Sequence, residues 1–115
     1  MNIETLREYC ISKAGVTEGF PFDKDTLVFK LDNKIFLLTN LASAQTFNVK
    51  FKPEKAIALR EEFEDIKPGF HMNKHHWNTV CYTESLTDKM LYILIDQSYD
   101  LVYKSLSKNQ QQKIN

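Results

Sequence analysis

Apolar residues recur at two different periods along this chain, and the changes of period divide it into helices and strands. A three-to-four-residue spacing predicts an amphipathic helix over residues 3–14, with Asn2 as its N-cap and Gly15 as its stop. The same spacing predicts a second helix that begins at Pro53 and ends near residue 64 or 65. A third helix is predicted from residue 87 or 88 to about residue 106.

Between these helices the apolar residues alternate with polar ones, which predicts strands. The clearest pair forms a hairpin, because Asp32 and Asn33 supply turn chemistry between two alternating runs. The stretch 15–25 contains two glycines, a proline and two phenylalanines, so we expect an ordered loop folded against the core. The predicted strands cover 26–31, 34–39, 47–51 and 77–82, and a shorter strand around 68–72 stays open.

The order of elements is helix, three strands, helix, one or two strands, helix. It shows no regular strand–helix–strand alternation, so the prediction is an α+β fold of two layers. An antiparallel sheet of four to five strands is expected to carry three helices on one face. The predicted domain covers residues 1–107, and the polar residues 108–115 are expected to fray.

The alternation also assigns faces to the sheet. If the helices cover the face that bears Phe29 and Phe47, the other face presents Lys30, Asn48 and Lys50 to solvent as a short basic stripe. The alternation does not determine on which face of the sheet Trp77 lies, because residues 77, 79 and 81 are about as apolar as residues 78, 80 and 82. Trp77 either anchors the sheet to a helix or is exposed.

The composition restricts the class of protein but gives little information on its function. The chain has 115 residues, with 15 Lys plus Arg balanced by 15 Asp plus Glu, so its net charge predicts no partner. No stretch has the length and apolarity of a signal peptide or a membrane span, which predicts a cytoplasmic protein without a membrane role. Cys10 and Cys81 lie far apart and outside any CxxC motif, so both are expected to be reduced thiols.

The segment 70–78 holds all three histidines and the only tryptophan of the chain, so it is the natural candidate site. His71 and His75 have the spacing of two metal ligands on a helix, but Pro68-Gly69 and the following strand residues disfavour a helix there. The sequence has no Ser-His-Asp pattern, no phosphate-binding glycine loop and no obvious carboxylate pair. We therefore expect no enzymatic activity, no bound metal and no cofactor.

The same segment suits a nucleic-acid interface better. Lysines can contact phosphates, asparagines can donate hydrogen bonds, and a tryptophan or histidine can stack on a base. Residues 50–77 contain nearly as many acidic as basic residues, so binding requires the acids to lie on the outer face of the second helix. The candidate DNA-binding residues are Lys50, Lys52, His71, Asn73, Lys74, His76 and Trp77.

The segment 68–80, PGFHMNKHHWNTV, resembles the signature of the YjbR/MmcQ-like family. The stretches LREYC at 6–10, VKFKPE at 49–54 and LIDQSY at 94–99 are similar to that family too, so the resemblance extends to about residue 110. It implies a small bacterial cytoplasmic protein of CyaY-like or secretion-chaperone-like α+β fold, in a double-wing arrangement. It also implies DNA binding, with no catalytic residues to carry over.

Three hypotheses follow for the function. The first is a non-enzymatic, monomeric DNA-binding protein that uses the basic strand face and the segment 71–77. The second is a protein-binding adaptor or chaperone-like module, because phenylalanines gather at residues 20–22 and 70. The third is a metal or small-molecule site at His71, His75 and His76.

Overall fold

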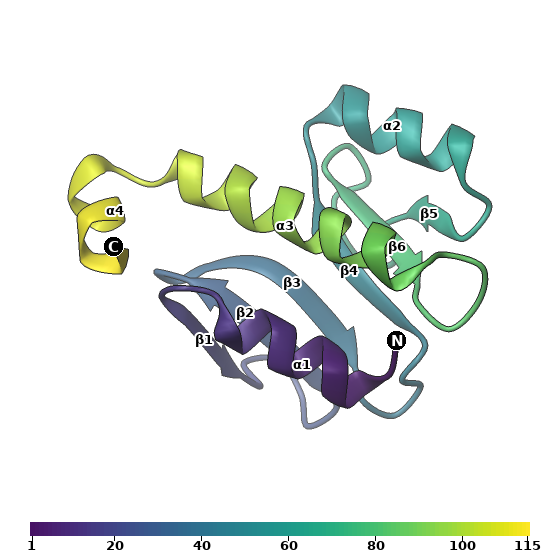
Figure 1. The fold of residues 1–115 in the computed structure, drawn as a ribbon, viewed down its shortest axis with the longest axis horizontal. Coiled ribbons are helices and arrows are strands. Elements are labelled where there is room, and N and C mark those ends of the chain that lie inside the picture. Colours follow the sequence, from purple (N-terminus) through teal and green to yellow (C-terminus); the bar gives the residue numbers. More distant parts are fainter.

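The computed structural model describes all 115 residues as an α+β fold with one six-stranded sheet and four helices (Figure 1). The α+β class predicted from the sequence is confirmed, with one strand and one helix more than the largest number expected. The helices are α1 (Ile3–Ser12), α2 (Pro53–Glu62), α3 (Asp88–Ser105) and α4 (Lys108–Ile114). The strands are β1 (Val16–Gly19), β2 (Thr26–Leu31), β3 (Lys34–Asn40), β4 (Thr46–Lys50), β5 (Ile66–Pro68) and β6 (Trp77–Cys81).

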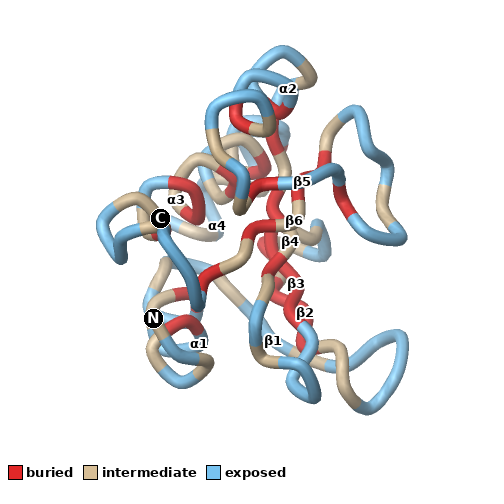
Figure 2. The backbone as a smooth tube through the Cα atoms, turned by 90° about the vertical axis from the view of Figure 1, so that its right-hand side faces the viewer, coloured by how far each residue is buried: buried red, intermediate tan, exposed pale blue.

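All neighbouring strands of the sheet are antiparallel, in the order β1-β2-β3-β4-β6-β5. Figure 1 shows α1 over the half of the sheet formed by β1, β2 and β3, α2 beside β5 and β6, and α3 running between them. Seen along the sheet in Figure 2, these helices gather on one side, and loops protrude on the other. The sheet therefore has a helical face and an open face.

The core lies between the helices and the face of the sheet that bears Phe29, Phe47 and Val49, as the alternation predicted. On the open face, Lys30, Asn48 and Lys50 occupy the alternate positions and are half-buried. The side chains of α3 that complete the core are Leu91, Leu94, Ile95 and Val102. Burial of such large side chains stabilises the fold by about 1.5–3 kcal/mol each.

The two halves of the sheet separate where α3 crosses it. The pairing of β3 with β4 ends at Leu37 opposite Val49, so the next backbone groups on each strand have no partner in the other strand. Ser98 of α3 lies between them and is fully buried. Its Oγ accepts a hydrogen bond from the N–H of Lys50 (2.8 Å) and donates one to the carbonyl oxygen of Phe36 (2.5 Å). A helix hydroxyl thus replaces a lost strand–strand bond.

A polar cluster ties α1 to α3. The hydroxyl of Tyr9 donates to Asp96 at 2.6 Å, and the same carboxylate forms an ion pair with Lys13 at 2.5 Å. The ammonium group of Lys13 also lies 4.9 Å from the ring centres of Tyr9 and Tyr99. Burial and the neighbouring carboxylate raise the pKa of Tyr9, so its hydroxyl stays a donor at neutral pH.

Two elements differ from the sequence prediction at the ends of the sheet and chain. Residues 16–19, expected to be part of a loop, form β1 because they pair with the outer edge of β2. Residues 108–114, expected to fray, form α4 instead. A capping box between Ser107 and Gln110 begins this helix, and Ile114 packs against Gly15. The strand left open around residues 68–72 lies at Ile66–Pro68.

Candidate functional site

The open face of the sheet carries the groove that we consider the candidate site. The strand pairings place Lys67, Thr79, Asn48, Leu38 and Val28 in one row across five strands. No helix covers this row, but two loops, residues 20–25 and 69–76, rise beside it. The row is polar at one end and apolar at the other, and its middle residues Thr79, Asn48 and Leu38 line a groove and form its floor.

The groove has a volume of about 580 Å³, which lies in the usual range for ligand sites. Phe22 and Asp23 line it from the loop 20–25, and residues 70–72 line it from the loop 69–76. Phe22 and Phe70 are the most exposed large apolar side chains, at 66% and 69%. The sheet contributes Thr26, Leu38, Thr39, Asn40, Thr46, Asn48 and Thr79.

A chain of hydrogen bonds connects one wall of the groove to its floor. The backbone N–H of Phe70 donates to Thr79 Oγ1 at 2.9 Å, and the Thr79 hydroxyl donates to Asn48 Oδ1. This order directs the amide oxygen of Asn48 toward Thr79. The amide nitrogen of Asn48 then has no protein partner and remains a donor at the groove floor.

The loop 69–76 is held in shape by its own polar groups. Asn73 Oδ1 accepts from the N–H of His75 at 2.9 Å, and its carbonyl accepts from the N–H of Trp77 at 2.9 Å. Lys74 Nζ donates to the carbonyl oxygen of Gly69 at 3.2 Å. Gly69 lies against Trp77, where a β-carbon would be 2.8 Å from the Trp77 Cβ. The close approach makes glycine necessary at this position.

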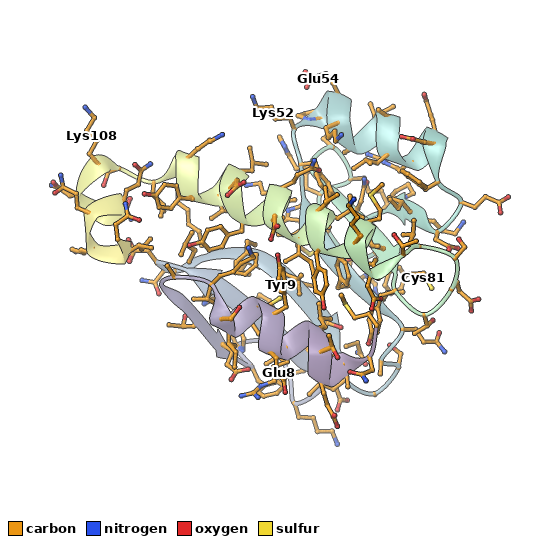
Figure 3. The ribbon with its side chains drawn as sticks, viewed as in Figure 1. Glu8, Tyr9, Lys52, Glu54, Cys81 and Lys108 are labelled. Atoms are coloured by element: carbon orange, nitrogen blue, oxygen red, sulfur yellow. The ribbon has the colours of Figure 1, made fainter.

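The structure brings only part of the expected DNA-binding set together. Lys50 lies opposite Trp77 on the open face, but Trp77 is only 9% exposed; it lies on the face away from the helices, with Gly69 of the loop against its backbone and Cβ. His71 lines the groove in a left-handed backbone conformation, with φ of 59°. His76 is half-buried, and its carbonyl accepts from the N–H of Phe51. Lys52 lies beside the start of α2 (Figure 3) and lines a hollow between α2 and α3.

Asn73 and Lys74 therefore shape the loop. His71 lines the groove, and Lys50 lies on the same face of the sheet outside the groove. No site was predicted at Thr26, Thr46 or Thr79, because isolated threonines in strands are also ordinary solvent-facing residues. The signal in the sequence that could have indicated Thr79 is the alternation that places it on the same face of the sheet as Asn48. Phe22 and Phe70 were predicted only as candidates for protein binding.

The strand positions of the open face differ from the helices in the charged residues that they carry. The strand positions of the open face include Lys30, Lys50 and Lys67 and no Asp or Glu. The acidic residues of α2 are exposed on the helical layer, away from its buried Ala56 and Leu59. The helical layer also carries basic residues, among them Lys55 and Arg60 of α2, so the difference is local: the strand positions of the open face are basic.

Asp23 is the acidic exception beside the groove, and it is held in a fixed position. Its carboxylate accepts hydrogen bonds from the N–H groups of Asp25 (2.9 Å) and Thr26 (2.7 Å). These bonds, the one from Thr26 first, lower the pKa of Asp23. The wall formed by the loop 20–25 therefore carries a negative charge at neutral pH.

The three histidines do not meet other ligands. No group of three or more His, Cys, Asp or Glu side chains in the structure is arranged to hold a metal ion. None of the four helices combines the length and apolarity needed to cross a membrane. Cys10 and Cys81 are both free thiols, as expected, the first buried and the second half-buried.

Comparison with known proteins identifies the class to which this fold and signature belong. The YjbR family model matches residues 11–101, so the chain belongs to the YjbR family. The chain is 34% identical over 112 residues to the uncharacterised protein YbdF of Escherichia coli O157:H7, covering 96% of this chain and 92% of YbdF. It is 33% identical over 100 residues to the uncharacterised protein YjbR of E. coli K12, covering 86% and 85% of the two chains.

Solved structures agree with this assignment. The crystal structure of the Deinococcus radiodurans protein DR2400, a DUF419 domain, matches with a TM-score of 0.88 and 32% identity. It covers 97% of this chain and 86% of its own. A crystal structure of a Pseudomonas syringae protein matches with a TM-score of 0.75 and 29% identity, over 88% of this chain and 98% of its own. The relatives support the fold and the family, and their names give no function.

Proposed function

We propose that the protein binds DNA with the open face of its sheet. The observation that carries the proposal is a basic set of strand positions in a neutral chain: Lys30, Lys50 and Lys67 lie on the open face, and no Asp or Glu occupies a strand position of that face. The acidic side chains of α2 lie on the opposite layer. This placement of the acidic residues is the condition under which the sequence predicts DNA binding.

In this proposal the lysines contact backbone phosphates and the loop 69–76 contacts the bases. His71 is the residue of the predicted set best suited to a base contact, because it is exposed and lines the groove. Asn73, Lys74, His76 and Trp77 act by shaping the loop. The protein acts as a cytoplasmic monomer, without a catalytic step or a cofactor.

Salt dependence and charge reversal test the proposal together. Three phosphate contacts predict that the logarithm of affinity falls with the logarithm of salt at a slope of about −2 to −3. Fluorescence anisotropy of labelled DNA at about 50 mM and about 200 mM salt measures this slope. The Lys50→Glu/Lys67→Glu variant is expected to abolish the salt-dependent binding.

The Lys55→Glu/Lys108→Glu variant is the matched control, because it makes the same charge change on α2 and α4 instead of on the open face (Figure 3 shows Lys108). It is expected to bind like the unmodified protein. Equal loss in both variants, or binding that neither variant weakens, would overturn the role of the open face.

A second candidate function is binding of a protein partner. The observation that favours it is the exposure of three phenylalanines in loops: Phe20 at 49%, Phe22 at 66% and Phe70 at 69%. Exposed aromatic side chains are enriched where proteins bind one another. Two results together would favour this function: DNA binding that does not depend on the three phenylalanines, and contact of these phenylalanines with a purified protein partner.

A further inference from the structure

We propose that the groove on the open face binds an unpaired nucleobase, so that the DNA recognised is single-stranded. This inference rests on the proposed DNA binding and specifies its ligand. Three features carry it: the two aromatic side chains of the walls, the oriented amide of the floor, and the charge distribution around the groove. Each feature selects a different part of a nucleotide.

The walls supply flat aromatic surfaces. Phe22 and Phe70 come from different loops, line the same groove and keep two thirds of their surface exposed. Exposed phenylalanine rings have an unfavourable contact with water, which a stacked base removes. Aromatic side chains on loops beside a sheet are a general means of binding unstacked bases, because every base has a π-face.

The floor supplies a directed donor. Thr79 is fixed by the N–H of Phe70 and in turn holds the Oδ1 of Asn48, so the Nδ2 of Asn48 is left to donate to a ligand. A base that lies between the walls presents its edge to this donor. The complementary acceptor is a carbonyl oxygen such as O2 of a pyrimidine, O4 of thymine or O6 of guanine. The hydrogen-bond chain also couples the position of Phe70 to the floor.

The charges separate base from phosphate. Asp23 carries its fixed negative charge on the groove wall, so a phosphate inside the groove is repelled. Lys50 is two residues from Asn48 on the same face, and Lys67 pairs with Thr79, so both flank the polar end of the floor. A neutral base therefore fits inside the groove, with its phosphates outside near the lysines.

Duplex DNA cannot fill this site without losing a base pair. In a duplex both faces of each base are stacked and its hydrogen-bonding edge is paired, so a base must leave the helix before aromatic walls can enclose it. That step costs a few kcal/mol and is already complete in a single strand. The groove thus predicts a preference for single-stranded DNA.

Three probes test this proposal: a labelled dT12 oligonucleotide, a duplex hairpin with the same number of nucleotides closed by a non-nucleotide linker so that every base is paired, and thymidine monophosphate. Phe22→Ala and Phe70→Ala each remove one wall. Phe20→Ala is the matched control, because Phe20 is an exposed phenylalanine of the same loop that does not line the groove. All three side chains are exposed, so the variants are expected to fold alike.

We expect dT12 to bind at least about ten-fold more tightly than the hairpin. Each wall variant is expected to weaken dT12 binding about ten-fold, while the Phe20→Ala variant stays within about two-fold. Thymidine monophosphate is expected to shift the backbone amide NMR signals of Thr79 and Phe70 and the side-chain amide signals of Asn48.

The outcomes separate the groove from the proposed function. If the hairpin binds as well as dT12, the wall variants have no effect and lysine reversal still abolishes binding, DNA binding stands and the base-binding groove is wrong. If thymidine monophosphate shifts the groove signals but no oligonucleotide binds, the groove takes a base and the proposed DNA binding fails. If none of the three probes binds, both proposals are refuted.

Discussion

Ser98 is the side chain whose removal tests the architecture most directly. Ser98→Ala deletes one oxygen from a fully buried position and leaves the N–H of Lys50 and the carbonyl of Phe36 without a partner. A buried backbone group without a hydrogen bond costs about 1–3 kcal/mol. Alanine recovers about 0.5 kcal/mol through its higher helix propensity. The expected loss in the free energy of unfolding is therefore about 2–5 kcal/mol.

Urea unfolding measures this loss as a lower midpoint at unchanged slope. For a domain of this size the melting temperature is expected to fall by roughly 8–20 °C. Ser12→Ala is the matched control, because Ser12 is an exposed helical serine whose Oγ bonds to the Tyr9 carbonyl in the same turn of α1. The amide of Lys50 is also expected to exchange faster with solvent in Ser98→Ala than in the control variant.

A stability of Ser98→Ala within about 0.5 kcal/mol of the Ser12→Ala value would refute the reasoning. The same holds if Lys50 retains its exchange protection, since protection without the hydroxyl means that another group satisfies the amide. In that case the separation of β3 from β4 would not depend on α3.

Three further predictions concern other parts of the chain. Gly69→Ala is expected to destabilise the fold by about 1–3 kcal/mol and to shift Trp77 fluorescence to longer wavelength, because a β-carbon clashes with the backbone and Cβ of Trp77 and displaces that residue. At pH 8 a thiol reagent is expected to modify Cys81 in the folded protein and Cys10 only on unfolding, since burial raises the pKa of Cys10 to about 12; mass spectrometry of the labelled peptides distinguishes them. Hydrogen bonds lower the pKa of Asp65 below its ordinary 3.8, so its contribution to stability is present above that value and is lost as the pH falls through the folded pKa. Melting curves between about pH 5 and pH 3 are therefore expected to depend less on pH in Asp65→Asn than in the unmodified protein.

The helices and strands with a regular spacing of apolar residues were predictable, because burial of one face of the element determines that spacing. The hairpin of β2 and β3 was expected over residues 26–31 and 34–39 and lies at Thr26–Leu31 and Lys34–Asn40. Residues 16–19 were missed because their strand state depends on pairing with β2 and leaves no local pattern. Residues 108–114 were missed because the polar composition outweighed a capping box at Ser107.

The candidate site was less predictable than the fold. The alternation assigned Asn48 and Lys50 to the correct face, but only the three-dimensional structure shows that the loops 20–25 and 69–76 reach the same groove. Trp77 illustrates the limit, since the sequence left its face open and the structure shows it only 9% exposed, on the face away from the helices. A cluster of conspicuous residue types marks an important segment, and it does not distinguish residues that contact a ligand from those that shape the loop.

The two outer strands of the sheet also determine how copies of this protein behave when concentrated. β1 has four residues and ends at Gly19, and β5 has three residues and ends at Pro68, which has no N–H to donate. Short edges of this kind offer little template for an additional strand from another chain, and Lys67 adds charge to one of them. The protein is thereby protected against edge-to-edge aggregation, and intermolecular recognition is left to side chains on the face of the sheet.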